Sequence, residues 1–219
     1  MHLTSPSAVR RRCCTESRLI IAGRKMSCGL WKETLALAED YLALCCTSAR
    51  SAPPSPPPSE SAAAMRRVAQ DMEAQNKARF QTLAQTFLRQ CGPDPCSSLR
   101  KVMEELVGDG LLNWGRVVSL FAFTGVLARM LQEQKEQKET AAKPGLDLSQ
   151  GPETCRRLAE TIADFLGEEK KDWLLENNEW EGFCKFCSSR EASQDLSMKT
   201  ALFAAAGVGL AGLTFLLVR

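Results

Sequence analysis

The sequence predicts an all-α protein: a helical bundle around a buried central apolar helix, followed by one transmembrane helix at the carboxyl end. Large apolar residues recur at helical spacing in several segments, and no segment shows the alternation typical of a strand. Residues 117–128 are uncharged and apolar nearly all the way round, which is typical of a helix at the centre of a core. Residues 200–218 are long and apolar enough to cross a bilayer.

Length and charge indicate one domain without a dominant electrostatic field. The 219 residues leave material for one compact domain, residues 26–196, once the two ends are set aside. The chain's 28 basic and 26 acidic residues are interspersed and give a net charge of +2. Because no global field would steer the chain onto nucleic acid, its partners must be inferred from local features.

Ten cysteines accompany a single histidine, His2, and no secretory signal. Most of the thiols fall in predicted helices, which favours buried and reduced side chains over a disulfide framework. Cys184 and Cys187 have the spacing of half a metal or redox site, but zinc needs four ligands and no second pair has that spacing. The sequence therefore predicts no metal and no cofactor.

Residues 1–25 carry six basic residues against one acid, Glu16, and their longest apolar run is too short for a signal peptide. A mitochondrial presequence is one interpretation. The favoured one is a disordered or alternative-start extension ahead of Met26.

A broad apolar face then predicts a helix over residues 30–46, and the proline-rich residues 47–61 predict a solvated linker.

Residues 62–90 are predicted to form one helix, which ends at the turn sequence of residues 91–96. Ser97 or Ser98 is predicted to cap a short helix that runs through Leu106 and closes at residues 108–110.

The central helix of residues 117–128 would rise only about 18 Å, against about 30 Å for the hydrocarbon core of a bilayer. A buried helix is therefore preferred over a membrane span, and the polar residues 132–145 are predicted to separate it from the next helix. That helix starts near Pro152 and should stop at Gly167. Two short helices with Trp173 and Trp180 follow.

Residues 200–218 form a run of nineteen uncharged residues between Lys199 and Arg219. A helix of this length matches the bilayer core, so the sequence predicts a tail anchor with the folded domain facing the cytosol. The mitochondrial outer membrane and the endoplasmic reticulum membrane are both compatible with its composition.

Three segments together resemble one known family. Residues 104–128 resemble the first homology region of the Bcl-2 family of apoptosis regulators, through the sequence Asn-Trp-Gly-Arg at residues 113–116. Residues 173–186 resemble its second homology region and residues 30–44 its fourth, and the apolar tail falls where the family carries an anchor. Within the family, the sequence is most similar to the Bcl-2-like protein 10 branch.

The resemblance implies a Bcl-2-like bundle with a surface groove that holds a partner's amphipathic helix. Arg116 would meet an aspartate of that helix, Asn113 would cap the helix or accept from its backbone, and Gly115 belongs to the same site. The apolar residues implied to line the groove are Met72, Leu83, Val102, Leu106 and Phe123.

Other interpretations of the same residues stay open. Each apolar groove residue could belong to an ordinary core. Arg116 stands at the positive end of an apolar helix and could instead pair with a neighbouring acid, Glu105 or Asp109. Trp114 and Trp180 are interpreted as packing anchors.

The function implied is that of an anti-apoptotic regulator, which sequesters death-promoting helices and keeps pore-forming relatives inactive. A pore-forming member is one alternative, but Gln70 replaces the aspartate that the third homology region needs for recognition by partners. Another alternative is control of calcium release from the endoplasmic reticulum through inositol trisphosphate receptors, with Glu33, Glu39 and Asp40 as the contacts. An enzyme is disfavoured because no histidine follows residue 2 to serve as a base.

Overall fold

The computed structural model describes residues 12–46, 55–108, 110–141 and 150–192. These residues form helices and no strand, which confirms the predicted all-α fold class. The elements are α1 (Arg12–Cys46), α2 (Glu60–Gln75), α3 (Lys77–Gln90), α4 (Pro95–Leu106), α5 (Trp114–Ala141), α6 (Gln150–Ala163), the π-helix η1 (Asp164–Glu169), α7 (Lys171–Glu176) and α8 (Glu179–Ala192).

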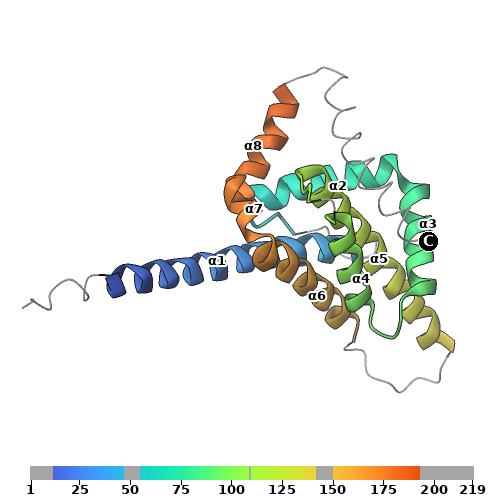
Figure 1. Cartoon of the computed structure of the whole chain (residues 1–219). Helices are drawn as coiled ribbons and strands as arrows, with labels where there is room; N and C mark the ends of the chain where they lie inside the picture. Colours follow the sequence, from blue (N-terminus) through green and yellow to red (C-terminus); the bar gives the residue numbers. More distant parts are fainter. Residues whose placement is uncertain (1–11, 47–54, 109, 142–149, 193–219) are drawn as a thin grey trace, which may run out of the picture.

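Helix α5 forms the centre of the bundle, with α1, α2, α3 and α6 packed against it (Figure 1). Residues 117–128 are all buried, as predicted. The helix is longer than expected, because the polar residues after Arg129 continue it to Ala141 instead of interrupting it. It is the one helix among the described residues with the length and apolar character of a membrane span, but its apolar part is mostly buried inside the protein. Burial, and not length, therefore identifies α5 as a core helix.

Helix α1 begins at Arg12, well before the predicted start at residue 30. Its amino-terminal part extends away from the bundle, while its carboxyl-terminal part packs against α5, α6 and η1 (Figure 1). The buried face of this packed part consists of Leu30, Thr34, Leu37, Ala38, Tyr41, Leu42 and Cys45.

The single helix predicted for residues 62–90 is two helices, α2 and α3, which meet at Asn76. The Asn76 side-chain amide donates to the carbonyl oxygen of Met72 at 3.0 Å. Its backbone N–H also donates to Met72 and to Glu73. An asparagine that bonds to nearby backbone in this way competes with a continuing helix, which explains the break.

Helix α4 starts at Pro95, and its cap is Asp94 instead of the predicted Ser97 or Ser98. The Asp94 carboxylate accepts from the backbone N–H groups of Cys96 and Ser97 at 3.2 and 3.3 Å. The turn predicted after the helix is present, since Gly110 has the left-handed φ of 74°.

The helix predicted to stop at Gly167 does not stop there. Helix α6 continues into η1, and Gly167 lies buried inside that π-helix. A Cβ at this position would lie 2.7 Å from the Trp31 Cα, so the glycine is required for close contact with the α1 backbone. Gly167 therefore allows close helix packing and does not end the helix.

The two short helices after η1 are confirmed as α7 and α8. They are separated at Asn178 and Glu179, both in the left-handed region with φ of 58° and 53°. Trp114 of α5 packs against the rings of Trp173, Trp180 and Phe183, with centroids 4.8, 5.8 and 5.4 Å away. The prediction that Trp114 and Trp180 are packing anchors is confirmed, because both are buried.

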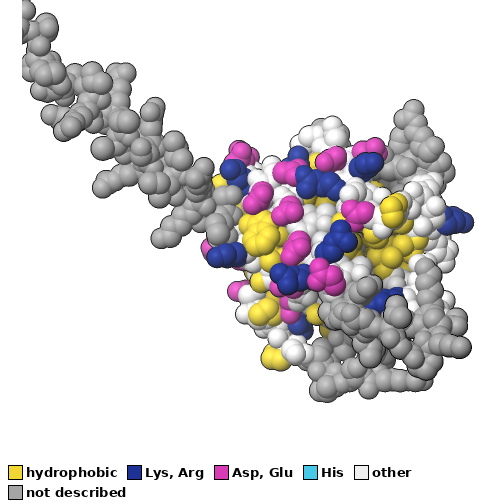
Figure 2. Space-filling model, turned by 90° about the horizontal axis from the view of Figure 1, so that it is seen from below, with side chains coloured by type: hydrophobic (Ala, Val, Ile, Leu, Met, Phe, Trp, Pro, Cys, Tyr) yellow, Lys and Arg dark blue, Asp and Glu magenta, His cyan; other side chains and the backbone are white. Residues whose placement is uncertain are grey.

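Acidic and basic side chains lie next to one another over the face shown in Figure 2, with hydrophobic side chains between them. Seven cysteines are shown as free thiols: Cys45 and Cys187 are buried, and Cys46, Cys91, Cys96, Cys155 and Cys184 are partly exposed. No group of three or more His, Cys, Asp or Glu side chains that could hold a metal ion occurs in this part of the chain. The predicted tail anchor, residues 200–218, lies outside the described residues.

Candidate functional site

The five apolar residues predicted to line a groove come from four helices that meet around α5. Met72 lies on α2, Leu83 on α3, Val102 and Leu106 on α4, and Phe123 on α5. All five belong to the same hydrophobic core cluster. The most exposed of them, Val102, has 7% of its surface accessible, so in this structure they form closed core and not the walls of an open groove.

Direct contacts join α2 and α3 to the central helix. The Ser119 hydroxyl on α5 donates to the carbonyl oxygen of Gly115 at 2.8 Å and lies 3.4 Å from the Met72 sulfur on α2. Phe123 packs edge-to-face against Phe87 of α3, with ring centroids 5.8 Å apart. Gly115 is buried in the first turn of α5. The α2 and α3 residues of the predicted site are therefore packed on the same central helix.

The polar residues of the site lie where α4 meets α5. The Asn113 side-chain oxygen accepts from the backbone N–H of Arg116 at 2.9 Å and so satisfies a donor in the first turn of α5. The Arg116 guanidinium donates through Nη1 to the carbonyl oxygen of Leu106 at 2.9 Å. Arg116 is 4% exposed.

This geometry explains how an arginine is accommodated at the positive end of α5. Its charged group reaches the carboxyl end of α4, where the helix dipole and the carbonyl groups favour a cation. Glu105, one of the two acids considered as its partner, is exposed, and Asp109 lies outside the described residues.

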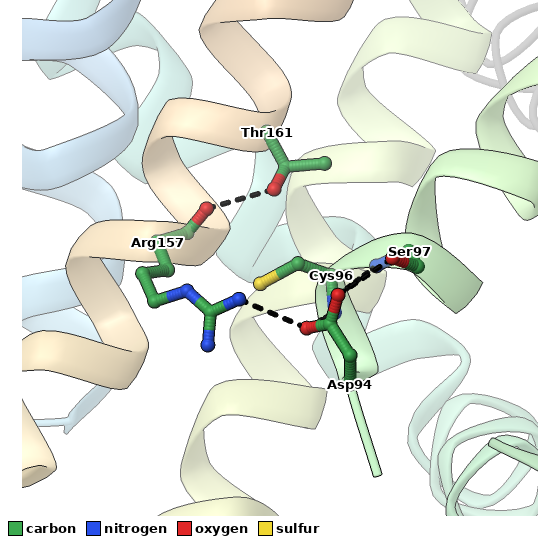
Figure 3. Close-up of polar contacts among 5 residues, drawn as sticks. All are labelled: Asp94, Cys96, Ser97, Arg157 and Thr161. Atoms are coloured by element: carbon green, nitrogen blue, oxygen red, sulfur yellow. Dashed lines mark hydrogen bonds and ion pairs between the residues drawn. The ribbon is translucent and has the colours of Figure 1, made fainter. Parts of the chain in front are cut away.

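A polar cluster between α4 and α6 fixes the position of α4 (Figure 3). The Arg157 guanidinium donates to Asp94 Oδ1 at 3.0 Å, and the Ser97 hydroxyl donates to Asp94 Oδ2 at 2.6 Å. The Ser97 hydroxyl, the backbone N–H groups and the Arg157 charge lower the pKa of Asp94. Cys96 lies beside Thr161 in this cluster, and burial raises the pKa of its thiol.

Further along α4, Arg100 forms ion pairs with Glu104 on the same helix and with Glu169 of η1. The helix is thus held at its start by Arg157, in its middle by Glu169 and at its end by Arg116. The sequence predicted none of these three contacts. An aspartate directly before a proline is a signal for a helix start, and it could have identified Asp94 as the cap.

Helix α2 is held to α1 by a paired charge. Arg66 donates to the two carboxylate oxygens of Asp40 at 2.8 and 2.5 Å, and to the carbonyl oxygen of Ser55 at 2.7 Å. The apolar residues Met65, Val68, Ala69 and Met72 face the core, while Gln70 and Asp71 are exposed. The hydrophobic face of α2 is therefore used inside this molecule.

A helical bundle around a buried apolar helix, with an Asn-Trp-Gly-Arg junction between α4 and α5, defines the class as a protein with the Bcl-2 fold. Residues 65–180 match the family described as apoptosis regulator proteins of the Bcl-2 family. The chain belongs to this family, whose members regulate apoptosis and are not enzymes.

Similar proteins include anti-apoptotic members. The anti-apoptotic protein NR13 of Gallus gallus is 38% identical over 199 residues, which cover 86% of this chain and 97% of the chicken protein. The NR13 protein of Coturnix japonica is 36% identical over the same lengths. The zebrafish pro-survival protein NRZ, solved in complex with a Bad BH3 segment, is 52% identical with a TM-score of 0.62. That match covers 74% of this chain and 97% of the zebrafish chain.

Proposed function

We propose that this protein protects cells from apoptosis by binding the amphipathic helix of a death-promoting Bcl-2 relative in a groove formed by α2, α3, α4 and α5. The observation that carries the proposal is the α4–α5 junction. There Arg116, held by Asn113, bonds to the carbonyl end of α4, and α4 also carries the apolar residues Val102 and Leu106, so a charge anchor and apolar side chains occur on adjoining elements. The zebrafish complex supports the proposal, because that pro-survival relative was solved with a BH3 segment.

Because the lining residues are buried, binding requires the helices over the site to move. Helix α3 is the candidate for this movement, since it packs on α2 and α5 and its Asn76 cap makes no side-chain hydrogen bond to it. Displacing α3 would uncover Leu83, Met72 and Phe123 together. The ligand would then replace the apolar contacts that α3 gives up. Because it would bind the open state more tightly than the closed state, binding would favour opening.

Arg116 would change partner during this step. In the free protein its guanidinium is held by the Leu106 carbonyl group. A ligand aspartate offers a charged acceptor instead, and such a hydrogen bond contributes about 1.5–3 kcal/mol when well aligned. The residue is therefore positioned in advance near the place where the ligand must be anchored.

The arrangement of α2 favours protection over a pore-forming role. A helix exported for recognition by partners would have to expose Met65, Val68 and Met72, all of which lie in the core. Gln70, at the position where the family pattern has an acid, is exposed and uncharged. Both observations support the proposal that this chain binds such helices.

The test is fluorescence anisotropy of the full chain in mild detergent with a labelled death-motif helix, and with the same helix carrying Asp→Ala. Arg116→Ala is expected to weaken binding about 10- to 100-fold, the equivalent of a charged hydrogen bond. The Asp→Ala helix should bind the wild type and Arg116→Ala equally weakly, as a double-mutant cycle requires.

Arg100→Ala is the matched control. It also removes one arginine charge, but from α4, where Arg100 pairs with Glu104 and Glu169. Its affinity should stay within about twofold of the wild type. An equal loss for Arg100→Ala, or an Asp→Ala effect that persists in Arg116→Ala, would contradict the proposed anchor.

We also propose that residues 200–218 anchor the protein in the mitochondrial outer membrane or the endoplasmic reticulum membrane, with the helical domain in the cytosol. The length of the apolar run supports this placement. Protease treatment of intact organelles should remove the domain and leave only a short membrane-protected fragment. Release of the full chain by alkaline carbonate would contradict a membrane span.

Regulation of inositol trisphosphate receptors remains the second candidate, because α1 carries two exposed acids, Glu33 and Glu39. Burial and the nearby charge of Glu179 raise the pKa of Glu33. Asp40, also suggested as a contact, is engaged by Arg66 and should be left intact. Receptor capture that is lost in Glu33→Lys with Glu39→Lys, but kept in Arg116→Ala, would establish an activity separate from helix binding.

A further inference from the structure

Two cysteines that lie far apart in the sequence meet where the end of α1 contacts α6. The sulfur atoms of Cys46 and Cys155 are 2.9 Å apart, although 109 positions separate the residues. Both side chains are partly exposed, so a small oxidant can reach them. The adjacent Cys45 is different, because it is buried next to Tyr41 and Gly125.

The geometry is close to that of a covalent bond. A disulfide has a sulfur–sulfur distance of about 2.05 Å, so the two atoms need to approach by only about 0.9 Å. Rotation of the two side chains can provide a change of this size. The helices that carry them, α1 and α6, pack against each other.

The electrostatics of the pair favour reaction at one sulfur. The hydrogen bond from Cys46 lowers the pKa of the Cys155 thiol, and the same bond together with burial raises the pKa of the Cys46 thiol. The Cys155 thiol is therefore the more acidic of the two, and the neighbouring Cys46 stabilises a thiolate at Cys155. Cys45 differs from both, because burial raises the pKa of its thiol to about 11 and keeps it protonated.

We propose that Cys46 and Cys155 are a reversible redox pair, which hydrogen peroxide oxidises to a disulfide bond that links α1 to α6. The Cys155 thiolate attacks the peroxide, so that its sulfur gains an oxygen as sulfenic acid while the peroxide O–O bond breaks and, after protonation, water is released. The Cys46 sulfur then attacks the sulfenic sulfur, the S–O bond breaks, and the Cys46 proton leaves with the oxygen as a second water. With hydrogen peroxide, two thiols and one peroxide give one disulfide and two waters. A dithiol reductant reverses the change.

The bond would fasten α1 to the bundle. It would close a loop of 109 residues, and cross-links across long loops restrict the unfolded chain strongly. The oxidised protein is expected to melt roughly 5–15 °C higher than the reduced protein. Oxidation would thus replace a non-covalent contact between two helices with a covalent bond that a reductant can break.

The primary test uses the wild-type full chain in mild detergent, fully reduced and then treated with hydrogen peroxide in slight excess. Thiols left free are blocked with a maleimide, and the digest is mapped by mass spectrometry without reductant. We expect a cross-linked peptide that joins residues 46 and 155, absent after dithiothreitol. Repeating the map in Cys45→Ala assigns the bond to Cys46, since the two cysteines are adjacent.

The variants Cys46→Ser and Cys155→Ser should lose both the cross-link and the peroxide-induced rise in Tm. Cys91→Ser is the matched control, because Cys91 is also partly exposed but its thiol donates to the Leu88 carbonyl group at 3.5 Å. It should keep both effects. A map in which Cys155 bridges to another thiol, or in which each cysteine is oxidised only to sulfinic acid, would overturn the proposal.

Discussion

Arg116 shows at the level of one residue how the same side chain can serve the fold and a ligand. In the free protein its guanidinium satisfies the end of α4, so the buried charge has an acceptor before any partner arrives. From the sequence alone, neither this carbonyl acceptor nor the burial of Met72 and Phe123 could be known, because both depend on how α3 and α4 close over α5. The Asn-Trp-Gly-Arg sequence pointed to this junction, but it could not indicate that the apolar residues around it are buried.

Thr34 is a second residue with more influence than its type suggests. Its hydroxyl donates to the Leu30 carbonyl group at 2.8 Å and accepts from Trp180 Nε1 at 3.0 Å. Thr34→Val keeps the shape and removes the acceptor, so the buried indole N–H loses its partner. We expect a loss of about 1–3 kcal/mol in the free energy of unfolding, measured in urea.

Thr161→Val is the control for this prediction. The Thr161 hydroxyl bonds to Arg157 within its own helix, and the residue is partly exposed. Its replacement should change stability by less than about 0.5 kcal/mol. Equal effects of the two substitutions would show that the Trp180 contact contributes nothing specific.

The cluster around Asp94 leads to a prediction about pH. The folded pKa of Asp94 is lowered, chiefly by the Ser97 hydroxyl and also by Arg157, so the contribution of this carboxylate to stability is fully present above its unfolded pKa. It is lost as pH falls through the lower folded value. Asp94→Asn retains a capping side chain and removes the charge. Its Tm should be below that of the wild type at pH 7, and the two should converge between about pH 4 and pH 2. A constant difference in Tm over that range would contradict the assignment.

At the level of elements, apolar spacing predicted where helices occur but not where they end. The break at Asn76 depends on one side-chain amide that bonds to Met72, and asparagine also occurs inside helices, so its type alone decided nothing. The continuation of α6 into η1 depends on contact with Trp31, a residue more than a hundred positions away. Boundaries set by tertiary contacts are not encoded in local spacing.

Two glycines test this conclusion with opposite expected signs. Gly167→Ala would place a methyl group 2.7 Å from Trp31 Cα and 3.2 Å from Trp31 N, both backbone atoms, so α1 and η1 must separate. We expect a loss of about 1–3 kcal/mol in unfolding free energy. Gly29→Ala lies in α1 with nothing within 4 Å, and it should stabilise by about 0.5–1 kcal/mol. Urea unfolding of both variants checks the signs, and a stabilised Gly167→Ala would rule out the close contact.

For the whole molecule, the sequence predicted the components of the candidate site but not their arrangement. The family resemblance pointed to Asn113, Gly115 and Arg116 at one junction and to five apolar residues, which lie on α2, α3, α4 and α5. Core and groove linings use the same side chains, so composition could not separate the two interpretations. In this structure Leu83, Val102 and Phe123 belong to the core, so the proposed groove would form only if the bundle opened.

Phe123 therefore contributes to stability as well as to any binding surface. It is fully buried against Phe87, so Phe123→Ala should lower the free energy of unfolding by about 3–5 kcal/mol. Leu175→Ala, at a position 37% exposed, should change it by no more than about 0.5 kcal/mol. Denaturation curves test both values. A mild effect of Phe123→Ala would indicate a site that is already open in solution.

The contact between Thr34 and Trp180 also affects how the protein is made. The two residues are 146 positions apart, and a ribosome adds roughly 5–20 residues per second, so about 7–30 s pass between the synthesis of one and the other. During that interval the apolar face of α1 has been made while α8 does not yet exist. The nascent chain must therefore shield this face by provisional contacts or with a chaperone until the last helix arrives.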